Sequence, residues 1–205
     1  MTNPLITSIV GTFVTLFPIT NPLGVVPIFY SLAGSESPHV RGRQARQIAF
    51  NAVIVLMIFF LMGRLILNFF GISLGVLQIA GGLLVGQTAW QMLSVHSDRE
   101  EAEHPDINQT KDISLIPMAI PLVSGPGAIG MTIALAAQNP QWWNYLGSLI
   151  GITLLGGTLY LCLALGEPLV KMIGKSGLKA FNQVLGFFIL AIAIQLIVDG
   201  LQSVV

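Results

Sequence analysis

Long stretches of this chain carry no charged side chain, and this constrains the fold more than any other feature of the sequence. Of the nine basic and nine acidic residues, all but Arg64 and Asp199 fall within three short segments, 36–46, 98–112 and 167–179. A transmembrane helix needs about 20 predominantly apolar residues to cross the hydrocarbon core of a bilayer. The charge-free stretches are long enough for such helices, so the sequence predicts an all-α integral membrane protein.

The composition excludes most water-soluble classes of protein. Charged residues make up 9% of the chain, against roughly 25% in a typical soluble domain, and the apolar fraction is 54%. A net charge of zero gives no general attraction to nucleic acid. The chain has neither a phosphate-binding Gly-x-x-x-x-Gly-Lys run nor a His or Cys with partners for nucleophilic catalysis. We therefore expect no enzyme, no cofactor, no metal site and no nucleic-acid partner, but a protein whose surroundings are the lipid bilayer.

Six apolar segments of suitable length are present. The charge-free stretch 113–166 is long enough for two helices, and Gln138-Asn139-Pro140-Gln141 is the polar turn that would divide it. The expected transmembrane helices are about Leu5–Leu32, Ile48–Leu67, Ile72–Leu93, Ile113–Ala137, Trp143–Leu165 and Ala180–Val198.

The basic residues indicate the orientation of these helices. Eight of the nine would lie in the loops after the first, third and fifth helices: Arg41, Arg43, Arg46, Arg99, Lys111, Lys171, Lys175 and Lys179. Cytoplasmic loops carry the excess of Lys and Arg, so both termini are expected in the periplasm of a bacterial inner membrane. The loop 94–112 contains His96 and His104 among acidic residues. We interpret it as a solvated cytoplasmic connector, because its spacing matches no closed metal site.

The two halves of the chain resemble each other at one offset. A shift of 104 residues aligns Thr20 with Ser124, Pro22 with Pro126, Gly82 with Gly186 and Gln91 with Gln195. The shift places the first helix on the fourth and the third on the sixth. Three helices per half is an odd number, so the second half must be inserted upside down. We therefore predict two inverted three-helix repeats, 1–93 and 113–205, joined by the loop 94–112.

Prolines and glycines interrupt the first helix of each half. The first helix contains Pro18-Ile19-Thr20-Asn21-Pro22-Leu23-Gly24, and the fourth contains Pro117, Pro121 and Ser124-Gly125-Pro126-Gly127. Each proline removes a backbone donor and disfavours helix in the preceding residue. Irregular backbone inside a membrane persists only where protein packs around it or where it lines a wet cavity. Paired broken helices predict a substrate site between the repeats, although prolines that kink helices for packing would give the same pattern.

The breaks offer groups suited to a small zwitterion. The first amides of a half-helix favour a carboxylate, and the last carbonyls favour an ammonium group. Intramembrane glutamines either complete a polar cavity or hydrogen-bond neighbouring helices. The predicted substrate-binding residues are Thr20, Asn21, Pro22, Gly24, Ser124, Gly125, Pro126 and Gly127 at the breaks, with the amides of Gln78, Gln91 and Gln195.

At these residues the chain resembles the MarC family, also described as a neutral amino acid transporter family. The resemblance rests on the stretches Asn21–Phe29, Phe70–Ser73, Ile79–Gly82, Pro117–Leu122 and Ser124–Ile129, and it covers essentially the whole chain. It implies a six-helix inner-membrane protein of two inverted repeats, with relatives that carry glycine, alanine and similar small neutral amino acids.

We hypothesise a secondary transporter for small neutral amino acids, in which one repeat rocks against the other around a midplane site. The substrate itself, the direction of transport, a coupling ion such as a proton or sodium, and assembly as a homo-oligomer stay open. Export of amino acids or other small metabolites is one alternative. A non-transporting membrane scaffold is another, although it leaves the two matched breaks unexplained.

Overall fold

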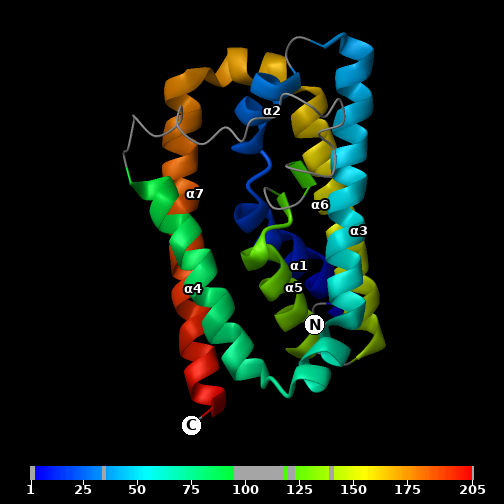
Figure 1. Cartoon of the computed structure of the whole chain (residues 1–205), viewed down its shortest axis with the longest axis vertical. Helices are drawn as coiled ribbons and strands as arrows, with labels where there is room; N and C mark the ends of the chain where they lie inside the picture. Colours follow the sequence, from blue (N-terminus) through cyan, green and yellow to red (C-terminus); the bar gives the residue numbers. More distant parts are fainter. Residues whose placement is uncertain (1–2, 34–35, 95–117, 120–122, 139–140, 205) are drawn as a thin grey trace.

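The computed structural model describes residues 3–33, 36–94, 118–119, 123–138 and 141–204. Within these ranges the chain is helical and has no β-strand. The α-helices, shown in Figure 1, are α1 (Pro4–Thr20), α2 (Val25–Ala33), α3 (Pro38–Phe70), α4 (Leu74–Leu93), α5 (Pro126–Gln138), α6 (Trp142–Ala164) and α7 (Gly166–Val204). The prediction of an all-α fold is therefore confirmed for the described residues.

The first expected helix is two helices. α1 and α2 are bent by 55° across the break at residues 21–24. Pro18 lies inside α1, in its last turn, so the irregular segment is shorter than the seven residues that the sequence suggested. Helix α1 begins where Asn3 accepts a hydrogen bond from the amide of Leu5, and Pro4 occupies the first turn, where a missing N–H costs little.

The segments 36–46 and 167–179 are largely helical, where the sequence analysis expected loops. Ser37 caps α3 and Pro38 follows it, so Arg41, Arg43 and Arg46 lie in the first turns of α3. Helix α7 likewise begins at Gly166 and has a kink at Gly174, where φ is 72°. Charge marks where an apolar span ends, but a cap and the propensity of each residue decide where the helix ends.

Two other expected helices agree closely with the structure, and a third only in part. α4 and α6 begin and end within two residues of their predicted bounds. The expected helix Ile113–Ala137 includes residues outside the described ranges, and its regular part, α5, begins only at Pro126. The loop 94–112, with His96 and His104, also lies outside the described residues apart from Ser94.

Three described helical segments, 38–70, 142–164 and 176–204, are long and apolar enough to cross a membrane. The number rises to four if the bent α1–α2 pair forms one span. A span count of six and the inverted repeat stay predictions.

The helices pack mainly between the two halves of the chain. The most extensive contact joins α4 to α7, which run side by side in Figure 1. Helix α1 packs against α6, α3 packs against both α5 and α6, and α4 packs against α5. Glycines allow the close α4–α7 approach: a Cβ added at Gly82 would lie 2.7 Å from the carbonyl oxygen of Ala193. The centre of this pair is the buried cluster of Val85, Ala89, Ile189 and Ala193.

Candidate functional site

The break between α1 and α2 is held together by Asn21. Its backbone is left-handed, with φ 42° and ψ 61°, and it is the one non-glycine residue with positive φ in the described ranges. Asparagine tolerates this conformation better than most residues. The Asn21 amide donates to the carbonyls of Phe17 and Pro18, and its side-chain Oδ1 accepts from the amide of Gly24 at 3.1 Å. A Cβ at Gly24 would overlap the Asn21 carboxamide, so Gly24 leaves room for this turn.

The break before α5 is anchored to α3. The backbone at Ser124 and Gly125 leaves the helical conformation, and α5 begins at Pro126. Ser124 is buried, its amide donates to the carbonyl of Ala119 at 2.9 Å, and its hydroxyl donates to the carbonyl of Ala52 in α3 at 3.4 Å. A Cβ at Gly127 would lie 2.8 Å from Val85, so Gly127 lets the first turn of α5 approach α4.

Both breaks adjoin the central α4–α7 cluster. Ile19, at the end of α1, packs on the cluster that contains Val85, and Gly127 faces Val85 itself. On the other side of the breaks, Val26 of α2 shares a buried cluster with Met118 and Val123. The two irregular segments therefore lie on the same part of the fold rather than on opposite outer flanks.

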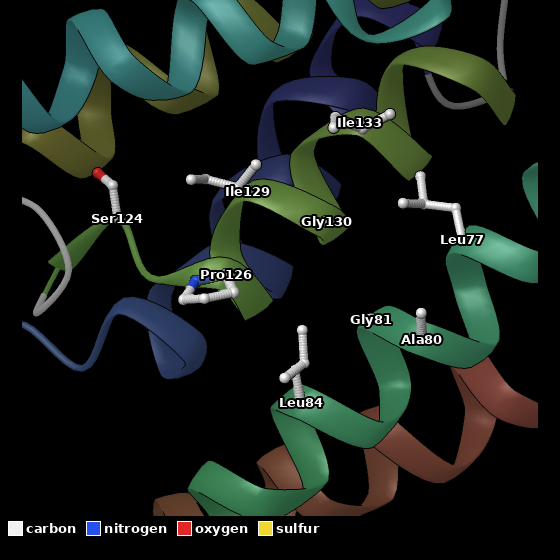
Figure 2. Close-up of a pocket in the computed structure, with 9 residues that line it drawn as sticks. All are labelled: Leu77, Ala80, Gly81, Leu84, Ser124, Pro126, Ile129, Gly130 and Ile133. Atoms are coloured by element: carbon white, nitrogen blue, oxygen red, sulfur yellow. The ribbon is translucent and has the colours of Figure 1, made fainter. Parts of the chain in front are cut away.

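A pocket of about 340 Å³ extends from the second break along the groove between α4 and α5 (Figure 2). Ser124 and Pro126 lie at one end. Its walls are formed by apolar side chains and glycines: Leu77, Ala80, Gly81 and Leu84 from α4, and Ile129, Gly130 and Ile133 from α5. In Figure 2 the Ser124 hydroxyl points away from α4, consistent with its bond to Ala52. No described residue of the α1–α2 break lines this pocket.

A profile of known sequences identifies the chain. The profile described as "MarC family integral membrane protein" matches residues 6–205. The chain belongs to the MarC family.

Relatives from bacteria and archaea support this membership of the MarC family. A UPF0056 membrane protein of Buchnera aphidicola (subsp. Schizaphis graminum) is 33% identical over 193 residues, covering 94% of this chain and 90% of the relative. A UPF0056 membrane protein of Pyrococcus abyssi is 33% identical over 191 residues, covering 93% and 92%. The UPF0056 inner membrane protein MarC of Salmonella typhimurium is 30% identical over 205 residues, covering 94% and 93%. No solved structure is significantly similar to the chain.

Membership and the apolar helices together make this a multi-pass membrane protein, and the Salmonella relative is named an inner membrane protein. Two of the stretches that carry the resemblance to the MarC family meet in space. Ala80 and Gly81, from the stretch Ile79–Gly82, face Ser124, Pro126 and Ile129 across the pocket.

The polar side chains predicted at the breaks are engaged within the protein. The Thr20 hydroxyl is buried and donates to the carbonyls of Leu16 and Phe17 in its own helix. Asn21 and Ser124 hydrogen-bond Gly24 and Ala52, as described above. Pro22 is buried, Pro126 is exposed, and Gly24, Gly125 and Gly127 are partly exposed. The arrangement leaves backbone groups, hydroxyl lone pairs and the side-chain NH2 of Asn21, whose Oδ1 accepts from Gly24, as the polar features of the breaks.

The three predicted glutamines are not brought together. Gln78 is buried and lies on the same face of α4 as Gly82 and Val85, the face that packs against α7. Gln91 is exposed on α4, and Gln195 is exposed on α7, where its amide donates to Asp199 at 2.6 Å. None of the three lines the described pocket.

Sequence reasoning missed most of the residues that line this pocket. Gly81, Leu84 and Gly130 were not predicted as site residues, because the sequence does not say which face of α4 meets α5. The available signal was the doubled glycine at 81–82. Gly82 packs on α7, whereas Gly81 lies on the adjoining face and borders the pocket.

Proposed function

We propose that this MarC-family chain is a secondary transporter of small neutral amino acids, with a substrate site at the two helix breaks. The observation that carries the proposal is the pocket that begins where α5 begins. Where irregular backbone borders a cavity in a membrane protein, its N–H and C=O groups can hydrogen-bond a substrate. We propose no catalytic role for these residues.

The ends of the half-helices fit the two charges of a zwitterion. The N-terminal end of α5 carries a partial positive charge and amides that favour a carboxylate, and Pro126 of this end borders the pocket. The C-terminal end of α1 presents carbonyls and a partial negative charge. The Thr20 and Ser124 hydroxyls donate to backbone carbonyls, so their oxygens stay available to accept from an ammonium group.

The registers of two helix pairs support an inverted repeat. Hydrogen-bonded Thr12 and Ser148 join α1 to α6 and are 136 residues apart, whereas Ser124 and Ala52 join the α5 segment to α3 and are 72 apart. Exchanging the two halves adds 104 to the number of a residue in the first half and subtracts 104 from one in the second. Applied to Thr12 and Ser148, this exchange gives positions 116 and 44, which are 72 apart, like Ser124 and Ala52. An arbitrary pair of helix contacts would not share this relation, which supports a repeat in which the two halves exchange places.

The α4–α7 contact follows the same rule. Gly82 faces the carbonyl of Ala193, and Gly186 faces the carbonyl of Ala89. The 104-residue shift converts one pair into the other. The pseudo-twofold axis would therefore pass through the cluster of Val85 and Ile189, which adjoins both breaks.

We place the moving boundary between the α4–α7 pair and the group formed by α1, α3, α5 and α6. The sequence alone suggested instead that one three-helix repeat rocks against the other. Among the described residues, however, the main contacts join the halves to each other, and a rigid motion of one half would break them all. The contact between α4 and α5 is less extensive than the contact between α4 and α7, and the pocket lies in the α4–α5 groove.

Uptake of labelled alanine and glycine into vesicles that contain the purified protein tests the proposal. We expect uptake above that of protein-free vesicles, and its loss in Gly125→Leu, because a bulky side chain there would occupy the break. Gly157→Leu is the matched control, since Gly157 is exposed on α6 and an added Cβ meets nothing within 4 Å. Equal uptake in wild type, Asn21→Ala and Gly125→Leu would reject the site.

A further inference from the structure

We infer that the α4–α5 pocket receives the side chain of the transported amino acid, and that this side chain is aliphatic and larger than that of glycine. The inference rests on the proposed transport function and adds to it the substrate class and the residues that set its size.

The walls of the pocket select an apolar group. Leu77, Leu84, Ile129 and Ile133 project into it or border it from the two helices (Figure 2). Among the described residues of the lining, Ser124 is the one with a polar side chain, and its hydroxyl donates to the carbonyl of Ala52. A charged or amide side chain would lose its hydrogen bonds to water here without regaining them, whereas an aliphatic side chain loses nothing.

The volume of the pocket favours a side chain larger than a hydrogen atom. The cavity measures about 340 Å³, and an apolar cavity of about 150 Å³ in another protein is large enough to bind benzene. Glycine would leave nearly all of the pocket unfilled, and alanine most of it. Valine, leucine and isoleucine would cover more of the apolar wall and gain correspondingly more from burial.

The pocket is continuous with the proposed site for the charged groups. Pro126 and Leu84 lie at the end next to the break, and Leu77 and Ile133 lie at the opposite end. An amino acid with its carboxylate at the start of α5 would therefore extend its side chain along the groove toward Leu77 and Ile133.

Two glycines set the width of the groove. A Cβ at Gly81 would meet nothing within 4 Å, and a Cβ at Gly130 would lie 3.6 Å from the Cα of Gly81, an ordinary contact distance. Alanine at either position would thus fill pocket volume without displacing backbone. Alanine also has the higher helix propensity, so these variants are expected to fold.

Competition against labelled alanine in vesicles containing the full chain tests the inference, with glycine, alanine, leucine and asparagine as competitors. For wild type we expect leucine to compete about tenfold better than glycine, and better than asparagine, which matches leucine closely in size but is polar. In Gly81→Ala and Gly130→Ala we expect leucine to weaken about tenfold while alanine changes less than twofold. Gly157→Ala, outside the pocket, should behave as wild type.

A variant with a larger pocket provides the opposite readout. Leu84 borders the groove near Pro126, and Leu84→Ala should strengthen competition by phenylalanine relative to wild type, because it adds room for the ring. Competition by glycine that equals or exceeds that of leucine in wild type would overturn the inference and leave alanine transport intact. Leucine competition unchanged in both glycine variants would overturn it as well. Absence of any alanine uptake by wild type would instead overturn the proposed function, and this inference with it.

Discussion

The hydroxyl of Thr12 in α1 donates a 2.9 Å hydrogen bond to the hydroxyl of Ser148 in α6, and both side chains are buried. The bond joins the two halves of the chain in a region with little water to replace it. Interhelical hydrogen bonds in membrane proteins contribute roughly 0.6 kcal/mol on average. We expect Thr12→Val to lower the free energy of unfolding by about that amount or somewhat more, measured by denaturation in mixed micelles. Thr153→Val is the control, since Thr153 is exposed and its hydroxyl donates only to Leu149 in its own helix. Equal effects of the two variants would contradict the assignment.

Gly82 permits the close approach of α4 to α7. A Cβ there would lie 2.7 Å both from the carbonyl oxygen of Ala193 and from the side chain of Ile197. The backbone of α7 would have to move, and overpacking of this kind costs about 1–3 kcal/mol. We therefore expect Gly82→Ala to lower the melting temperature in detergent, whereas Gly157→Ala, where space is open, should leave it unchanged or raise it. A Gly82→Ala protein as stable as the Gly157→Ala protein would show that this interface is looser than described.

Asn21 and Gly24 form one unit at the first break. The carboxamide of Asn21 occupies the space that a Cβ at Gly24 would take. Gly24→Ala should therefore destabilise the protein, and most of that loss should disappear in the Asn21→Gly background, because the overlapping group is gone. Asn21→Ala should be less stable than Asn21→Gly by about 1–2 kcal/mol, since alanine is strained at positive φ. A double-mutant cycle of melting curves measures the coupling, and additive effects would refute it.

The distribution of basic residues predicts which ends of the helices face the cytoplasm. In a Cys162→Ala background, Arg43→Cys in α3 and Gln202→Cys in α7 each place an exposed thiol near one membrane face. With both termini in the periplasm, a membrane-impermeant maleimide should label Gln202→Cys in intact spheroplasts and Arg43→Cys only after lysis. Wild type, with Cys162 buried, should label weakly. The reverse pattern for the two variants would invert the proposed topology.

The lengths of the apolar segments and the positions of prolines and polar turns were enough to predict most of the helices. Trp142–Ala164 departs by one residue at each end from the expected Trp143–Leu165, because apolar content and a proline-containing turn delimit it. The first break was found because Asn21 and its neighbouring prolines are local signals. Arg41 was expected in a loop and lies in α3, because the Ser37–Pro38 cap starts the helix before the apolar span.

The site was less predictable than the helices. The sequence places Thr20 and Ser124 at the breaks but does not reveal that each hydroxyl bonds a backbone carbonyl. Nor does it give the register of α4 against α5, which brings Gly81 to 3.6 Å from a Cβ built on Gly130. Such facts depend on tertiary packing, in which residues distant along the chain select one face of a helix.

The most direct test of a shared site at the two breaks is counterflow of labelled alanine in vesicles preloaded with unlabelled alanine. Exchange requires a binding site that opens alternately to both sides, but no ion gradient and no preferred direction of transport. The account predicts a transient accumulation of label in vesicles with wild type and with Gly157→Leu, and none with Gly125→Leu. Exchange by wild type no faster than in protein-free vesicles, or equal exchange in wild type and Gly125→Leu, would contradict it.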